Sequence, residues 1–268
     1  MSAQKPKGSF ELQYVKTIGI VNNISGRGFN NPYDVAISRD KRIFVANRCG
    51  SEERTRAIRI GICTLDEQYL HEFGQYGAGD GQMILPSGLA FDSQDRLYLS
   101  DEHLDRISVF NSSGNYLHHW GKHGNGDGLL DGPSGVAFDS KDNVYVVDQN
   151  NHRVQKFTAN GEYQLQWGEE GNRNGEFNLP WGITVDTLGN VFVADWRNDR
   201  IQKFTAEGDF LLQIGRSGSG AGQFQRPSGV AVDRGGRIYV TDWGNDRLQV
   251  FEPDGSFVTM FTGDAGMS

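Results

Sequence analysis

Three tryptophans stand at positions where an indole ring can take part in recognition. Trp181 follows a proline, and Trp196 and Trp243 each follow an aspartate. An indole that core packing does not require can stack on a sugar, a base, an aromatic side chain of a peptide or a cation. The other interpretation, which the sequence leaves open, is that each indole covers the backbone of a neighbouring loop.

Five further side chains capable of stacking, charge pairing or hydrogen bonding occupy matching positions, after a proline or within two residues after the aspartate position. They are Tyr33, Arg48, His103, Gln149 and Arg197. We call these five residues and the three tryptophans the recognition set, and we expect them to contact a ligand or partner. Neither Gly-x-Ser-x-Gly nor His-Glu-x-x-His occurs in the chain, so no catalytic residue is predicted.

An aspartate followed five residues later by an arginine recurs four times. The pairs are Asp101 and Arg106, Asp148 and Arg153, Asp195 and Arg200, and Asp242 and Arg247. A carboxylate and a guanidinium this close in sequence can form charge-assisted hydrogen bonds across one tight loop. We therefore interpret each pair as a structural clamp. An earlier copy differs, because it has Asn47 in place of the aspartate and reaches Arg59 only after an insertion.

These positions recur because the chain consists of repeats. Each copy opens with Pro-x-Gly, an apolar run and an aspartate, and the regular copies start 47 residues apart, at Pro86, Pro133, Pro180 and Pro227. An earlier copy starts at Pro32 and contains seven extra residues, which lie in the charged segment 48–56. That segment is either a lid or docking finger, or a tolerated surface insertion. A period of this size indicates a solenoid, a propeller or an array.

Each copy contains four short segments with the composition of β-strands. In one copy they are 135–139, 144–148, 153–157 and a segment that ends at Gly168, separated by turns rich in Asp, Asn, Ser and Gly. No window has the apolar spacing of a helix. Four antiparallel strands in a unit of this length, repeated radially, are typical of a β-propeller blade.

The repeated phrases resemble the NHL repeat. The resemblance rests on Pro-x-Gly-Val-Ala-Val-Asp, then Tyr-Val-x-Asp, then Asn-x-Arg-Val-Gln-x-Phe, and it covers about residues 14–263. It implies a propeller that commonly has six blades. We therefore expect an all-β propeller of four-stranded antiparallel blades, with five complete blades starting near residues 32, 86, 133, 180 and 227 and an N-terminal strand of a sixth, incomplete blade.

The N-terminal strand is expected at 14–19, because this run aligns with the fourth strand at 116–121. The alternative is a five-bladed ring with a surplus N-terminal strand. An open ring would expose strand edges and so favour self-association. For domain organisation we expect a flexible tail over residues 1–9 and a single propeller domain over 10–268.

Antiparallel topology places the Pro-x-Gly segments, the loops from Asp to Arg and the glycine-rich linkers on one face of the disc. We expect this loop-bearing mouth of the central channel to carry the recognition set. Asp34 replaces the glycine of Pro-x-Gly where the first strand enters the channel, and a carboxylate there is a candidate for a cation site. The six histidines are scattered, whereas a catalytic zinc needs several to converge. We predict no cofactor, with zinc or calcium in the channel as the alternative.

The sequence favours a binding module over an enzyme. We expect recognition of a peptide segment or a small organic ligand at the mouth. One alternative is a metal-assisted lyase or hydrolase with its site in the central channel, because the NHL resemblance includes a zinc lyase that releases amidated peptides. The second alternative is an RNA-binding NHL domain, which the net charge of −8 disfavours.

Composition limits the other possibilities. No stretch approaches the ~20 apolar residues of a membrane span, and the first ten residues lack the apolar core of a secretory signal. We therefore expect a cytoplasmic protein that has no membrane partner. Cys63 occupies the place of a phenylalanine in the other copies, so we expect it to be buried, and we predict no disulfide with Cys49.

Overall fold

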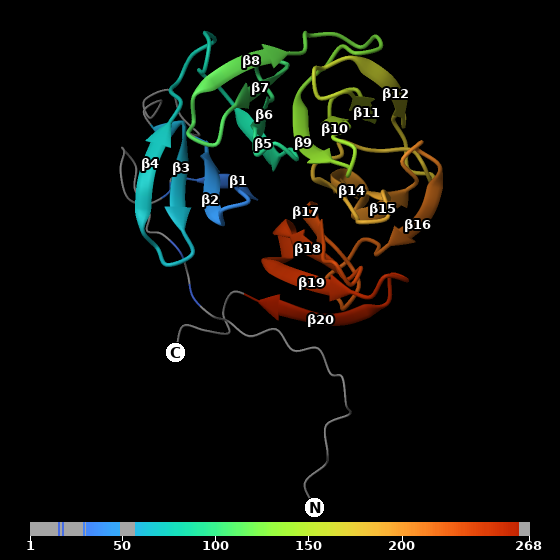
Figure 1. Cartoon of the computed structure of the whole chain (residues 1–268). Coiled ribbons are helices and arrows are strands. Elements are labelled where there is room, and N and C mark those ends of the chain that lie inside the picture. The colour runs from blue at the N-terminus through green and yellow to red at the C-terminus, as the bar shows by residue number, and fades with distance from the viewer. Residues whose placement is uncertain (1–15, 17, 19–28, 30, 49–56, 263–268) are drawn as a thin grey trace, which may run out of the picture.

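The computed structural model describes residues 16, 18, 29, 31–48 and 57–262. The described strands form five four-stranded antiparallel sheets, arranged as blades around a common centre (Figure 1). In each blade the strands follow one another in sequence order, from an innermost first strand to an outermost fourth strand. The prediction of an all-β propeller with four-stranded blades is confirmed.

The strands have the following bounds. Blade 1 comprises β1 (Pro32–Ile37), β2 (Arg42–Asn47), β3 (Arg59–Thr64) and β4 (Tyr69–Phe73). Blade 2 comprises β5 (Pro86–Phe91), β6 (Leu97–Asp101), β7 (Arg106–Phe110) and β8 (Tyr116–Trp120). Blade 3 comprises β9 (Pro133–Phe138), β10 (Val144–Asp148), β11 (Arg153–Phe157) and β12 (Tyr163–Trp167).

Blade 4 comprises β13 (Ile183–Val185), β14 (Val191–Asp195), β15 (Arg200–Phe204) and β16 (Phe210–Ile214). Blade 5 comprises β17 (Pro227–Val232), β18 (Ile238–Asp242), β19 (Arg247–Phe251) and β20 (Phe257–Thr262). Two 3-10 turns, η2 (Trp196–Asn198) and η3 (Trp243–Asn245), follow the second strands of blades 4 and 5. No helix in the described part of the chain has the length and apolarity needed to cross a membrane.

The core consists of apolar layers between successive blades. In β10, Val144 and Val146 pack against blade 2, whereas Tyr145 and Val147 pack against blade 4. Strands with apolar residues on both faces are what a blade between two neighbours requires, because successive side chains point to opposite faces. Cys63 is buried as predicted, and its burial raises the pKa of the thiol.

The glycine of Pro-x-Gly is explained by the close approach of neighbouring innermost strands. A methyl group at Gly135 would lie 2.6 Å from the carbonyl oxygen of Trp181 in blade 4, and one at Gly182 would lie 2.5 Å from the carbonyl oxygen of Ser228 in blade 5. Gly135 donates its backbone N–H to the same Trp181 oxygen at 3.0 Å. The channel wall therefore depends on the absence of a side chain at these positions.

The prediction of a six-bladed type with an incomplete last blade was wrong. The described strands from Pro32 to Thr262 all belong to five complete blades, and no strand is left over for a sixth. Of the run 14–19, interpreted as the outermost strand of that blade, only Lys16 and Ile18 are described. Ile18 is in no strand, and it packs against the outer face of blade 1. An apolar residue that was expected in a strand of a sixth blade instead covers the face of the sheet of blade 1. The predicted tail over residues 1–9 lies outside the described residues.

Among the strands that the structure describes, those of blades 1 and 5 each form a sheet with one face that no further blade covers. Val35 and Ile37 of β1 are 55% and 59% exposed. On the last blade, Tyr239 is only partly buried, whereas Tyr98 and Tyr145 at the same place in blades 2 and 3 are completely buried. We call the region between blade 1 and blade 5, that is between β1–β4 and β17–β20 in Figure 1, the open junction.

Candidate functional site

In blades 3, 4 and 5 a buried hydrogen-bonded cluster lies where the second strand ends and the third strand begins. In blade 4, Asp195 accepts hydrogen bonds from Arg200 Nε at 2.8 Å, Asn198 Nδ2 at 2.9 Å and Gln202 Nε2 at 3.0 Å. Arg200 Nη2 in turn donates to the carbonyl oxygens of Arg173 and Glu176 in the preceding linker. The cluster thus fixes the linker to the blade that follows it, and the clamp interpretation is confirmed for these three blades.

Blade 2 does not form the predicted clamp. Arg106 donates to the carbonyl oxygens of Ala78, Gly79 and Gln82, but its Nε, the atom that binds the aspartate in blades 3 to 5, has no hydrogen-bond partner and does not pair with Asp101. Asp101 instead accepts hydrogen bonds from four backbone N–H groups. Blade 2 has leucine and serine where the other blades have the cluster asparagine and glutamine, so the side-chain donors that align the carboxylate with the arginine are missing. In blade 1, Arg59 pairs with Glu72 at 2.8 Å.

A cavity of about 670 Å³ occupies the centre of the propeller. Residues of all five innermost strands line it, and Val45, Tyr239, Thr241 and Leu248 extend the lining into the open junction. The residues after the repeat prolines contribute Tyr33, Ser87, Trp181 and Ser228. Ser134, at the same position in blade 3, is buried and donates its hydroxyl to the Trp181 carbonyl oxygen at 3.0 Å.

An aromatic row crosses the channel from blade 1 to blade 4. The rings of Tyr33 and Trp181 are 5.6 Å apart between centroids, and those of Trp181 and Trp196 are 5.8 Å apart. Blades 1 and 4 are not neighbours in the ring, so the Tyr33–Trp181 contact spans the channel. We call Tyr33, Trp181 and Trp196 the aromatic row. Both contacts are tilted, at interplanar angles of 49°, which suits ring quadrupoles better than a face-to-face sandwich.

Guanidinium groups lie at both ends of the aromatic row. Arg48 Cζ is 4.4 Å from the centre of the Tyr33 ring, and Arg48 also pairs with Glu102 at 2.7 Å. At the other end, Arg226 Cζ is 4.5 Å and Arg197 Cζ is 5.6 Å from the Trp196 ring. Cations over ring faces hold the rings by electrostatic attraction to the quadrupole. The row is therefore fixed at its ends, and its middle ring, Trp181, faces the cavity.

The structure brings five members of the recognition set together and leaves three apart. Tyr33, Arg48, Trp181, Trp196 and Arg197 form the group just described. Trp243 is 67% exposed on η3 and makes no ring contact with the aromatic row. His103 is exposed on the loop after β6, and Gln149 is buried after β10, and neither lines the cavity. Most of the insertion, residues 49–56, lies outside the described residues.

Sequence reasoning missed Arg226. Its backbone has φ = 60°, and its N–H donates to Asp199 Oδ1 at 2.8 Å, an arrangement that directs the side chain over Trp196. The residue before the repeat proline is uncharged in blades 1 to 4, where it is Asn, Leu, Gly and Leu in turn. The arginine at this position in blade 5 was therefore the feature of the sequence that could have pointed to a role for Arg226.

Asp34 joins the innermost strands of blades 1 and 2. Its Oδ2 accepts the backbone N–H of Leu89 at 2.7 Å, and its Oδ1 accepts that of Val35 at 2.8 Å. Burial in the channel wall nevertheless raises the pKa of Asp34 to about 6. The carboxylate lines the cavity, but among the described residues no other metal-ligating side chain joins it in a candidate metal group.

The raised pKa predicts how an Asp34→Asn variant will respond to pH. Below pH 3.8 the carboxyl group is neutral in both states, and between pH 3.8 and about 6 the unfolded chain releases its proton first, so the wild type loses stability as the pH rises. Asparagine cannot ionise. We expect the stability of the variant relative to the wild type to increase by about 1–2 kcal/mol between pH 4 and 7.5, after screening by solvent in the channel.

Urea unfolding of both proteins at the two pH values measures this difference. Asp40→Asn is the matched control, because the hydrogen bond from Arg42 lowers the pKa of this exposed carboxyl group, whereas burial raises that of Asp34, so the Asp40 variant should not gain stability over the wild type as the pH rises. A pH-independent difference for Asp34→Asn would contradict the prediction.

Comparison with known proteins identifies the repeats. A sequence profile of the NHL repeat matches residues 130–157, 177–204 and 224–251. The chain carries NHL repeats. The three matches fall on blades 3, 4 and 5 of this NHL-repeat propeller, which are the blades with a complete Asp, Asn, Arg and Gln cluster. No curated protein matches the sequence.

Solved structures of similar fold have low sequence identity to this NHL-repeat propeller. A protein of unknown function from Bacteroides caccae is 14% identical, with a TM-score of 0.63 over 86% of this chain and 81% of its own. A catalytically inactive His-to-Ala variant of virginiamycin B lyase from Staphylococcus aureus, with quinupristin, is 14% identical, with a TM-score of 0.62 over 93% and 88%. A streptogramin B lyase is 15% identical, with a TM-score of 0.59 over 93% and 87%. These similarities show the fold.

Proposed function

We propose that this NHL-repeat propeller is a binding module that takes a peptide segment or a small organic ligand at the loop-bearing mouth of its channel. The observation that carries the proposal is the aromatic row, in which Trp181 lies between two fixed rings and lines the cavity. A cavity of about 670 Å³ has the size of a site for a small molecule or for a few peptide side chains.

The lining of the cavity suits apolar and aromatic groups. Val35, Leu89, Val136, Ile183 and Val230 contribute aliphatic surface from the five innermost strands. A few polar groups, among them Ser87, Thr184 and Thr241, offer hydroxyls that can fix the orientation of a ligand. Apolar walls with few polar groups are typical of ligand sites.

The alternative of a lyase or hydrolase has less support in this site. The structurally similar lyase loses its activity when a histidine is replaced by alanine. The described residues that line the cavity here include Asp34 but no histidine. The geometry therefore supports binding better than acid–base or metal-assisted chemistry.

Replacing Trp181 with alanine should weaken ligand binding by at least about 30-fold, the effect of losing ~2 kcal/mol at a recognition hot spot. The probe is a peptide selected from a random 12-residue library on the immobilised chain, and the readout is the Kd from isothermal titration calorimetry. The same substitution at Trp196, which supports Trp181 from behind, should weaken binding by a smaller factor.

Trp243→Ala is the matched control, because Trp243 occupies the same sequence position as Trp196 but lies outside the aromatic row. Its Kd should equal that of the wild type. Equal losses in all three variants, or none in Trp181→Ala with the fold intact by circular dichroism, would refute binding at the row.

A further inference from the structure

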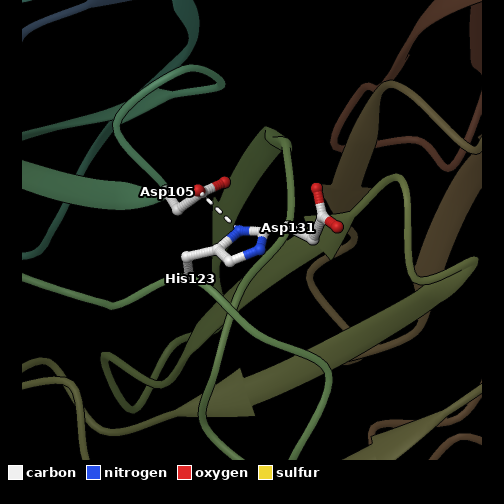
Figure 2. Close-up of side chains that lie close together, drawn as sticks. All are labelled: Asp105, His123 and Asp131. Atoms are coloured by element: carbon white, nitrogen blue, oxygen red, sulfur yellow. Dashed lines mark hydrogen bonds and ion pairs between the residues drawn. The ribbon is translucent and has the colours of Figure 1, made fainter.

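Asp105, His123 and Asp131 form a cluster at the junction of blades 2 and 3, away from the central cavity. Figure 2 shows the imidazole of His123 between the two carboxylates. His123 Nδ1 is 2.9 Å from Asp105 Oδ2, and one ligand atom from each of the three residues lies within 4.8 Å of the others. Among the described residues this is the one such group of potential metal ligands.

The protein holds both carboxylates in place through one oxygen each. Asp105 Oδ1 accepts the backbone N–H of Gly132 at 2.8 Å, and Asp131 Oδ1 accepts Asn150 Nδ2 at 2.8 Å. Asp105 Oδ2 faces the imidazole, and Asp131 keeps its second oxygen for a further partner. Hydrogen bonds that orient ligands in this way are typical of the surroundings of metal sites.

The repeat shows which part of the cluster the fold requires. At each of the junctions after blades 2, 3 and 4, the residue just before the repeat proline donates its backbone N–H to a side chain of the preceding blade. The acceptor is Asp105 in blade 2, His152 in blade 3 and Asp199 in blade 4. That role needs one residue only. The other two positions of the cluster hold Glu and Asn at the next junction and Ser and Gln at the one after it. An imidazole and a second carboxylate thus join the structural aspartate at one junction only among the three, and packing does not account for them.

We propose that Asp105, His123 and Asp131 bind a divalent zinc ion that links blade 2 to blade 3. Nitrogen and carboxylate oxygen are ligands of zinc, and an imidazole favours zinc over the hard cations calcium and magnesium. Ligand atoms around tetrahedral zinc lie roughly 3.3 Å apart, close to the spacing of His123 Nδ1 and Asp105 Oδ2. The side chain of His123 is 70% exposed, so an ion can enter from solvent and water can complete the coordination.

Zinc should also stabilise the fold, because the ligands come from two different structural units. Asp105 belongs to the loop between β6 and β7 of blade 2, whereas His123 and Asp131 belong to the linker that leads into blade 3. An ion that binds this arrangement in the folded state and not in the unfolded chain raises the melting temperature, and the stabilisation grows with the logarithm of the ratio of zinc concentration to Kd.

The test is zinc titration of the untagged chain after EDTA treatment and dialysis, followed by isothermal titration calorimetry and thermal unfolding. We expect one zinc ion per chain and a higher Tm with zinc, and no heat from calcium or magnesium at the same concentration. His123→Ala and Asp131→Asn should each weaken zinc binding by at least tenfold. Asn at position 131 can still accept the Asn150 hydrogen bond, so this variant removes the ligand and keeps the fold.

His119→Ala is the control, because His119 is a partly exposed histidine 3.8 Å from a single carboxylate, Asp80. It should bind zinc as the wild type does. Zinc binding that survives both cluster variants, or is lost equally in His119→Ala, would place the ion elsewhere and overturn the proposal, as would the absence of binding to the folded wild type.

Discussion

Replacing Arg200 with methionine should lower the free energy of unfolding by about 3–5 kcal/mol. Asp195 is completely buried, and burial raises the pKa of its carboxyl group, so the charged form depends on the donors around it. Methionine retains the apolar bulk of the side chain and removes the guanidinium that pairs with Asp195 at 2.8 Å. The loss is large because it leaves a buried carboxylate with fewer partners. In addition, the Arg173 carbonyl loses its side-chain donor, and the Glu176 carbonyl keeps only Gln202 Nε2.

Arg106→Met in blade 2 is the matched comparison. Arg106 also binds three linker carbonyls, but Asp101 takes its hydrogen bonds from backbone N–H groups. We expect this variant to lose about 2 kcal/mol less than Arg200→Met, since no carboxylate loses its partner. Urea unfolding followed by circular dichroism measures both.

A double-mutant cycle isolates the ion pair. If Asp195→Asn is added to Arg200→Met, part of the lost stability should return, because asparagine carries no charge to bury. Equal losses for the two arginine variants, or strictly additive losses in the cycle, would show that the linker contacts alone account for the clamp.

The features predicted correctly from the sequence are those that each repeat determines by itself. Strand composition, tight turns and a carboxylate five residues before an arginine are local, so aligned copies identify them. The clamp of blade 2 was mispredicted for a reason that was visible in the same alignment: Leu104 and Ser108 replace the asparagine and glutamine donors of the other blades. The aspartate and the arginine alone do not form the clamp, because neutral side-chain donors are needed to align the carboxylate with the guanidinium.

The features that were missed depend on which blade follows which. Trp196 and Trp243 occupy identical sequence positions, yet Trp196 is covered by Arg226 of the next blade, whereas Trp243 belongs to the last blade and remains exposed. The number of blades also depends on how the blades pack around the channel, and the length of the repeat does not determine it. The Tyr33–Trp181 contact across the channel could not be foreseen for the same reason, because it joins blades that are not adjacent in sequence.

Introducing a methyl group at Gly135 should lower the free energy of unfolding by about 2–4 kcal/mol. The added carbon would lie 2.6 Å from the carbonyl oxygen of Trp181 and 2.9 Å from the backbone nitrogen of Ile183. Both are backbone atoms of the innermost part of blade 4, so relief requires that blades 3 and 4 move apart. That movement also weakens the hydrogen bond from the Gly135 N–H to the same carbonyl oxygen.

Gly229→Ala provides the matched control at the same repeat position in blade 5, which has no following blade. A methyl group there would approach only a side chain, the Thr241 hydroxyl at 2.8 Å, and this group can rotate away at the cost of the hydrogen bond that it accepts from the Gly229 N–H. We expect a loss of less than about 1 kcal/mol, measured by urea unfolding alongside Gly135→Ala. Because the obstructed carbonyl belongs to Trp181, Gly135→Ala should also weaken peptide binding at the aromatic row, whereas Gly229→Ala should not. If both variants lose less than about 1 kcal/mol of unfolding free energy, the innermost strands of blades 3 and 4 are not held in the close contact described here.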